Sequence, residues 1–253
     1  MIFGFSKLNN IKKAAKIVSD ILLKLKDLSQ PNMELSYLEK MVENLIIKNG
    51  AKSYNKGYFP KWAPNPYPSI LCASINEEAV HCPPKNKVLR EGDIVKYDIG
   101  IRYKDRCGDA ALTIGIGNIS KEKKDLIYHT RKVLEEATKL VKADLPIMIL
   151  TRFMENYMAQ YGYKAIKGYS GHGIGKEMHE KPIISNSCDG KDYGILKENQ
   201  VICIEPIFTT GNGKVRKKKD GWSVETKDGK PVAQFESMVL VKKNGYEILT
   251  YHL

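Results

Sequence analysis

The stretch DIVKYDIGIRY (93–103), followed by DAALTIGIG (109–117), decides the fold. Both runs are rich in β-branched residues and are separated by turn-forming residues, so we predict two strands joined as a hairpin. Successive side chains of a strand point to opposite faces, which places the charged Asp98 within an otherwise apolar strand. With the turn centred on residues 103–104, the pairing predicts that Asp109 lies opposite Asp98.

Two facing carboxylates repel each other, and burial increases the cost unless a cation lies between them. Backbone donors or nearby Lys and Arg side chains could instead satisfy Asp98 and Asp109, so the pair alone leaves both interpretations open. Glu205 in VICIEPIF and Glu236 in AQFESMVLV are also lone acids in apolar strand-like runs. His172 lies in SGHGIG, where we expect the glycines to allow a tight turn that leaves the imidazole accessible. Four carboxylates with one imidazole favour two divalent cations, such as Mn, Fe(II), Co or Zn, and a hydrolytic reaction.

Two helices are predicted before these strands. Apolar residues spaced by three and four predict a helix that starts at Ser6 and ends before Pro31. A second helix is predicted to start at Ser36 with a capping box to Glu39 and to end at Gly50. The sequence then predicts an ordered, aromatic-rich loop and a strand, at 55–68 and 69–75.

The same order of elements then repeats. Ser120 is predicted to cap a long helix, and a shorter helix is predicted over 148–161. Strand-like runs return at 201–209, 232–242 and 246–250. Two helices followed by strands, twice over, indicate two similar halves of one domain, and the missing βαβ alternation favours the α+β class.

Composition narrows the class of protein without choosing the reaction. The chain has 253 residues with 42% hydrophobic residues, enough to bury a core. Five cysteines without C-x-x-C spacing argue against a disulfide framework and favour a reducing compartment. No apolar run approaches the roughly 18 residues of a membrane span, and no export signal is visible. We therefore expect a cytoplasmic protein that does not interact with membranes.

The charge is strongly basic, with 41 Lys and Arg residues against 29 Asp and Glu residues and a net charge of +12. The excess makes polyanions plausible partners. The run KVRKKK (214–219) is either a solvated loop or a loop that docks on ribosomal RNA. Its basic residues are Lys214, Arg216, Lys217, Lys218 and Lys219.

Several motifs together resemble those of type I methionine aminopeptidases of peptidase family M24, from about the first helix to the C-terminus. They are SINEEAVHCPP with His81, KYDIGI with Asp98, CGDAALT with Asp109, GHGIGKEMHEKP with His172 and His179, IEPIF with Glu205, and QFES with Glu236. The resemblance implies a pita-bread fold, in which two pseudo-symmetric halves form an antiparallel β-sheet covered by helices. Residues 1–253 would then be a single catalytic domain.

The resemblance also implies a ligand set for two divalent ions, with Co, Mn, Fe(II) and Zn all open. Asp98 would bind one ion through both oxygens, and Asp109 and Glu236 would bridge the pair. His172 and Glu205 would complete the second ion. A bridging hydroxide would attack the first peptide bond.

By the same resemblance, Glu205 acts as general base and then acid, His179 polarises the scissile carbonyl, and His81 contacts the scissile amide nitrogen. The implied activity removes methionine from nascent proteins and peptides when the second residue is small, and the implied state is a monomer. The implied pocket for the methionine side chain consists of Tyr67, Cys72, His81, Met178 and Trp222.

Three features depart from the family pattern: Met178, Ala110 and the stretch KWAPNP at 61–66. None of them is an implied metal ligand, so we expect them to tune the pocket. We assign no functional role to His129 or His252.

Two alternatives are an aminopeptidase P or prolidase-like enzyme and a non-catalytic pita-bread protein that binds ribosomes or RNA. The first usually carries a large N-terminal domain, whereas the SILCASI run here already begins at residue 69. The second typically loses metal ligands, whereas all five implied ligands are present.

Overall fold

A long antiparallel hairpin forms the middle of the first half of the fold. The computed structural model describes residues 5–250. Strands β4 (Ile94–Tyr103) and β5 (Arg106–Gly115) pair along their whole length. Most side chains of both strands are buried, as the apolar sequence predicts.

The predicted pairing within this hairpin is wrong by two residues. Asp98 lies opposite Ala111, and Asp109 lies opposite Gly100. The turn comes one residue later than expected because Lys104 takes a positive φ of 52°, the conformation that a tight two-residue hairpin turn needs. A shift of two residues keeps side chains on the same face, so both carboxylates still point to one side of the sheet.

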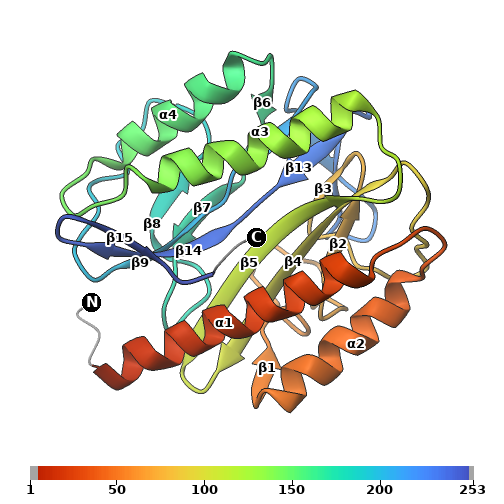
Figure 1. The fold of residues 1–253 in the computed structure, drawn as a ribbon, viewed down its shortest axis with the longest axis horizontal. Helices are drawn as coiled ribbons and strands as arrows, with labels where there is room; N and C mark the ends of the chain where they lie inside the picture. The colour runs from red at the N-terminus through yellow and green to blue at the C-terminus, as the bar shows by residue number, and fades with distance from the viewer. Residues whose placement is uncertain (1–4, 251–253) are drawn as a thin grey trace.

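The helices form two pairs on opposite sides of the strands. Figure 1 shows one pair along the lower edge of the molecule and the other along the upper edge, with the strands between them. Ser120 caps the third helix as predicted, accepting a hydrogen bond from the Lys123 N–H at 3.3 Å. Among residues 5–250, no helix is both long and apolar enough to cross a membrane. The helices are α1 (Phe5–Leu28), α2 (Leu35–Lys48), α3 (Lys121–Thr138) and α4 (Ile147–Ala159).

Within residues 5–250 the strands form four antiparallel sheets, in the orders β1-β4-β2 with β5 beside β4, β15-β14-β9-β7-β8, β13-β10-β6 and β11-β12-β3. The α+β prediction is therefore confirmed. The remaining strands are β1 (Ala51–Ser53), β2 (Cys72–Ile75), β3 (Glu78–Val80), β6 (Lys164–Ala165), β7 (Ser170–Gly173), β8 (Glu180–Ser185), β9 (Val201–Ile204), β10 (Ile207–Thr209), β11 (Val215–Lys217), β12 (Val224–Thr226), β13 (Val232–Gln234), β14 (Ser237–Lys242) and β15 (Gly245–Ile248).

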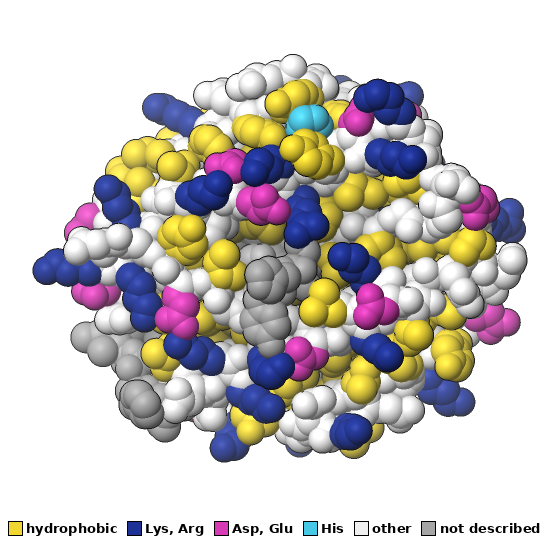
Figure 2. Space-filling view, in the orientation of Figure 1, with side chains coloured by type: hydrophobic (Ala, Val, Ile, Leu, Met, Phe, Trp, Pro, Cys, Tyr) yellow, Lys and Arg dark blue, Asp and Glu magenta, His cyan; other side chains and the backbone are white. Residues whose placement is uncertain are grey.

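Basic side chains are spread over the face of the molecule drawn in Figure 2. Figure 2 shows Lys and Arg side chains scattered across the visible face and interspersed with acids and apolar groups. The chain has a net charge of +12, but on this face its basic side chains do not form one continuous patch.

Two predicted strands are interrupted at their acidic residues. The run 201–209 divides into β9 and β10 at Glu205, which Pro206 follows without an N–H to continue the ladder. The run 232–242 divides into β13 and β14 around Glu236. The Glu236 N–H donates to the Ala111 carbonyl at 2.8 Å, so the second interruption bridges to β5 of the other half.

The capping box predicted for the second helix is wrong. The N-cap of α2 is Glu34, and the Ser36 hydroxyl donates to the Glu34 carboxylate at 3.1 Å. The Glu39 carboxylate instead accepts the backbone N–H of Ile70 at 2.8 Å. A long-range contact has therefore replaced the local one, and it fixes the loop before β2 against α2.

Helix α1 packs closely on β5 at Gly108. A Cβ atom at this position would lie 2.7 Å from the carbonyl carbon of Ala14 and 2.8 Å from its oxygen. These atoms belong to helix backbone, which cannot move aside as a flexible side chain could. Glycine at 108 therefore sets how closely the helix approaches the strand, one residue before Asp109.

We expect Gly108→Ala to lower the free energy of unfolding by about 2–3 kcal/mol, because the added methyl group overpacks a buried interface. Gly245→Ala is the matched control, since no atom lies within 4 Å of a Cβ at that position. Urea denaturation of both variants measures the difference. Equal stability losses in the two variants would contradict the proposed close packing.

Candidate metal centre and active-site pocket

A cavity of about 400 Å³ lies between the two halves of the fold. Strands β2, β4, β5 and β7 and the interruptions that precede β10 and β14 all contribute to its wall. The structure brings together in this cavity every residue that the sequence assigned to the site. They are Tyr67, Cys72, His81, Asp98, Asp109, His172, Met178, His179, Glu205, Trp222 and Glu236.

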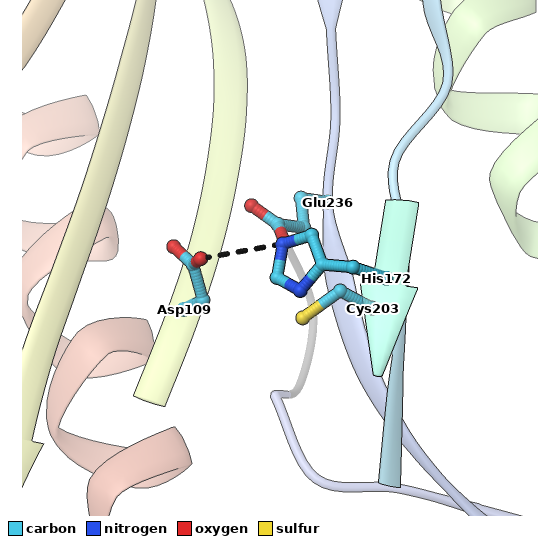
Figure 3. Close-up of side chains that lie close together, drawn as sticks. All are labelled: Asp109, His172, Cys203 and Glu236. Carbon is cyan, nitrogen blue, oxygen red and sulfur yellow. Dashed lines mark ion pairs between the residues drawn. The ribbon is translucent and has the colours of Figure 1, made fainter. Parts of the chain in front are cut away.

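One group of donors surrounds His172. Its Nε2 lies 3.7 Å from Asp109 Oδ2, drawn as a dashed line in Figure 3, and 3.7 Å from Glu236 Oε1. Glu236 is only 2% exposed, and its Oε1 has no hydrogen-bond partner among the residues that the structure describes. An unpaired buried carboxylate oxygen is costly unless a cation neutralises it. This donor set therefore fits a divalent metal ion.

A second group of donors is organised by Gln234, which the sequence interpretation missed. Its side-chain amide donates to Glu205 Oε1 at 2.7 Å and to Asp98 Oδ2 at 3.4 Å. The signal was present in the motif QFES, as an amide among apolar residues two positions before Glu236. Gln234 therefore orients two carboxylates that would otherwise repel each other.

Electrostatic repulsion among the four carboxyl groups disfavours their ionised forms. Burial raises the pKa of Asp98 to about 6. Burial, followed by repulsion from neighbouring carboxylates in the same cavity, raises the pKa values of Asp109, Glu205 and Glu236 well above their usual range. Two divalent cations would balance four carboxylates, and they would restore the ionised forms that bind metal.

The imidazoles of the cavity are held neutral. Burial, helped by repulsion from His179, lowers the pKa of His172 to about 3 and that of His81 to about 4. Burial also lowers the pKa of His179, whose ring centroid lies 4.5 Å from that of His172. A neutral imidazole offers a lone pair to a metal ion or a substrate N–H, and an N–H to a carbonyl.

His81 is also strained, since its φ is 58° in a region that residues other than glycine rarely adopt. Such strain is typical of functional positions that the surrounding structure holds in place.

The predicted accessible turn around His172 is wrong. His172 lies in strand β7 and is 8% exposed. A Cβ at Gly171 would lie 2.2 Å from the Cys203 carbonyl oxygen, and one at Gly173 would lie 2.3 Å from that of Lys181. The two glycines therefore allow neighbouring strands to approach closely, and this approach buries the imidazole.

The stretch 61–66 forms part of the pocket wall. The Trp222 ring meets Trp62 and Tyr67 edge-on, each at 5.1 Å between centroids, and Trp222 Nε1 donates to the Asn65 carbonyl at 3.0 Å. The sequence indicated an ordered aromatic loop over 55–68, but of its side chains only Tyr67 was assigned to the cavity. The aromatic residues missed are Tyr54, Tyr58, Trp62 and Tyr169.

The basic run at 214–219 is partly an ordered strand, which corrects its interpretation as a loop. Residues 215–217 form β11, and Arg216 pairs with Glu225 at 2.8 Å. Lys218 lies 3.6 Å from the same carboxylate. The Lys217 ammonium lies 3.8 Å above the Trp62 ring, which connects this strand to the pocket wall.

The remaining histidines lie elsewhere. His129 stacks on Tyr161 with 3.6 Å between ring centroids, outside the cavity. His252 lies outside the described residues.

Comparisons with known proteins agree on one family. The family model for metallopeptidase family M24 matches residues 9–243. A methionine aminopeptidase of Aquifex aeolicus is 34% identical over 252 residues, covering 98% of each chain.

Solved structures of methionine aminopeptidases and prolidases are similar to this chain. The crystal structure of a methionine aminopeptidase from Thermotoga maritima has a TM-score of 0.93 and 35% identity, and the match covers 100% of this chain and 99% of that one. A prolidase from Pyrococcus furiosus has a TM-score of 0.78 and 22% identity, and the match covers 66% of its chain. This prolidase shares the fold with the present chain.

We expect the affinity for a divalent ion to fall by about tenfold or more between pH 7 and pH 5. The proton competes with the cation for Asp98 once the pH drops below that carboxyl's pKa of about 6, and the other raised carboxyls add to the effect. Calorimetric titration of Mn(II) into chelator-treated protein measures the change. The exposed Asp105 provides a control variant, Asp105→Asn, which should keep the same pH dependence. Equal affinity at both pH values would contradict the cation site.

Proposed function

The chain belongs to metallopeptidase family M24 as a methionine aminopeptidase, and we propose how its own side chains remove N-terminal methionine from nascent polypeptides. The observation that carries the proposal is one cavity that combines four carboxylates, of which Asp109 and Glu236 are buried, with neutral imidazoles and an apolar wall. The prolidase-like alternative is supported by a likeness of fold alone. In a non-catalytic protein that binds no metal ion, nothing would offset the free-energy cost of burying these carboxylates.

Asp98, Asp109, His172, Glu205 and Glu236 are the proposed ligands of two divalent ions. The charge balance and the unpartnered Glu236 oxygen support this assignment. When bound, the ions supply a water of lowered pKa and polarise the substrate carbonyl.

Three side chains are proposed to handle protons and hydrogen bonds. Glu205 accepts the proton of the attacking water and returns it to the departing amine, a role that suits a carboxyl whose pKa is raised by burial and by Asp98. His179, neutral and beside His172, donates its N–H to the scissile carbonyl oxygen. His81 accepts from the scissile amide or holds it in position.

The methionine side chain is proposed to occupy the apolar end of the cavity. Met178 is 2% exposed and lines the cavity, as do Tyr67, Cys72 and Trp222. A thioether suits such polarisable aromatic and sulfur surroundings. On the other side, the ring of His81 meets that of Tyr169 at 5.6 Å, and we propose that this pair leaves space only for a small second residue.

We further propose that residues 1–253 act as one catalytic domain, because the cavity takes ligands from both halves. The cytoplasm is the proposed location, since the five cysteines are free thiols. A monomer is the proposed state, since one chain supplies every proposed ligand.

Peptide hydrolysis tests the assignment. Metal-loaded protein should release methionine from Met-Ala-Ser about tenfold faster, or more, than from Met-Leu-Ser, because the larger side chain meets the His81–Tyr169 wall. His179→Ala should lower kcat about 100-fold by removing a donor to the carbonyl. His129→Ala, which alters a histidine outside the cavity, should retain activity. Cleavage of Xaa-Pro peptides with none of Met-Ala-Ser would replace this assignment with the prolidase one.

The basic run is the proposed contact with the ribosome. Its candidate residues are Lys214, Arg216, Lys217, Lys218 and Lys219. Arg216 and Lys218 already pair with Glu225, and Lys217 packs on Trp62. Lys214 and Lys219 are exposed and extend the charge on both sides of β11. This arrangement supports phosphate binding by the two flanking lysines.

We expect Lys214→Glu combined with Lys219→Glu to abolish cosedimentation with ribosomes at low salt, because two phosphate contacts become repulsive. The control makes the same charge change at exposed Lys24 and Lys243, on α1 and in the β14–β15 turn. Methionine release from a free tripeptide should be unaltered in both variants. Unchanged cosedimentation of the first variant would remove the ribosome proposal and leave the enzymatic one intact.

A further inference from the structure

Cys203 faces the metal centre from strand β9. It lies directly opposite His172 of β7, and directly paired residues of neighbouring strands point to the same face. Its side chain is fully buried. Figure 3 shows the sulfur atom beside the imidazole ring of His172, in the group that Asp109 and Glu236 complete.

The spacing of these four side chains matches one coordination sphere. A single donor atom from each of Asp109, His172, Cys203 and Glu236 lies within 4.8 Å of all the others. Donors that bind one ion at about 2.0–2.3 Å can lie at most about 4.6 Å apart. The sulfur therefore needs only a small side-chain adjustment to share an ion with its neighbours.

A second observation points to a ligand at the same place. Glu236 Oε1 is buried in this group and has no hydrogen-bond partner among residues 5–250. The Cys203 thiol itself contacts the Glu236 carboxyl group, and this side-chain hydrogen bond is among the causes of both groups' shifted pKa values. The Cys82 and Cys107 thiols point elsewhere, since they donate to the carbonyls of Val80 and Lys176, each at 3.3 Å.

We propose that Cys203 is an additional, sulfur ligand of the ion held by Asp109, His172 and Glu236. The inference rests on the metal centre proposed above and extends its ligand set. When the ion binds, the S–H bond breaks, a sulfur–metal bond forms, and the proton passes to solvent. Thiolate ligands favour zinc, cobalt and Fe(II) over manganese, so Cys203 biases the site toward these metals.

X-ray absorption of the zinc-loaded protein tests the proposal on the unmodified chain. The expected result is a sulfur scatterer at about 2.3 Å from zinc, in addition to nitrogen and oxygen. The cobalt-loaded protein should show a sulfur-to-cobalt charge-transfer band in the near ultraviolet. A first shell of nitrogen and oxygen alone overturns the proposal whether or not any variant folds.

Cys203→Ser should lose both sulfur signals, and its affinity for zinc relative to manganese should fall about tenfold or more. Cys203→Ala should give the same spectra if the serine variant is unstable. Cys107→Ser, which alters another buried thiol near the cavity, should keep the signals of the unmodified protein. A sulfur shell that persists in the Cys203 variants comes from another residue and overturns the assignment.

These outcomes separate the inference from the proposed function. A protein that binds zinc or cobalt and releases methionine without a sulfur signal retains the proposed function and loses only the Cys203 ligand. A protein that binds neither metal loses both.

Discussion

The mutual repulsion of four carboxylates that share one cavity is the constraint on which the rest of the structure depends. One strand could not bring four carboxylates into the same cavity, because its successive side chains on one face are spread along its length. Asp98, Asp109, Glu205 and Glu236 therefore come from different segments of the chain. The fold distributes them over the β4–β5 hairpin and two strand interruptions from the other half. Burial and mutual repulsion raise their pKa values, so the ionised cluster requires cations. The cavity thus holds negative charge, from four carboxylates, that bound cations would neutralise.

Interruptions between strands direct Glu205 and Glu236 into the cavity. A residue within a continuous ladder can point only above or below the sheet. At Glu236 the chain leaves β13, and its backbone N–H bonds the Ala111 carbonyl of β5. At Glu205 the ladder of β9 ends because the following residue, Pro206, has no N–H to donate. Both interruptions place a carboxylate at the junction of the two halves, so the cavity takes its acidic residues from both.

The sequence predicted the class of fold, the helix pairs and the acidic and histidine residues that share the cavity, but it predicted neither the local geometry nor the whole cavity wall. Period-two alternation identifies the face on which Asp98 and Asp109 lie even when the predicted register is two residues wrong, since a shift of two preserves the face. The capping box at Ser36 failed because Glu39 is used by Ile70, a contact between distant parts of the chain. The glycines beside His172 also respond to a distant strand, whose carbonyl oxygen at Cys203 leaves no room for a Cβ at 171. In each case the missing information was tertiary, and no local pattern contains it.

The division between a basic exterior and an acidic interior is not complete, and β11 is where the two meet. Lys217 belongs to the basic run, yet its ammonium rests on Trp62 of the pocket wall. Its charge also adds to the effects of burial and His179 that lower the pKa of His81. A cation near the cavity mouth favours neutral His81, which is the form that can accept a hydrogen bond from a substrate amide. Burial is the largest cause of the His81 pKa of about 4, so the imidazole stays neutral near pH 7 even when the charge of Lys217 is offset. Lys217 therefore connects the basic run to the pocket wall without controlling the protonation of His81.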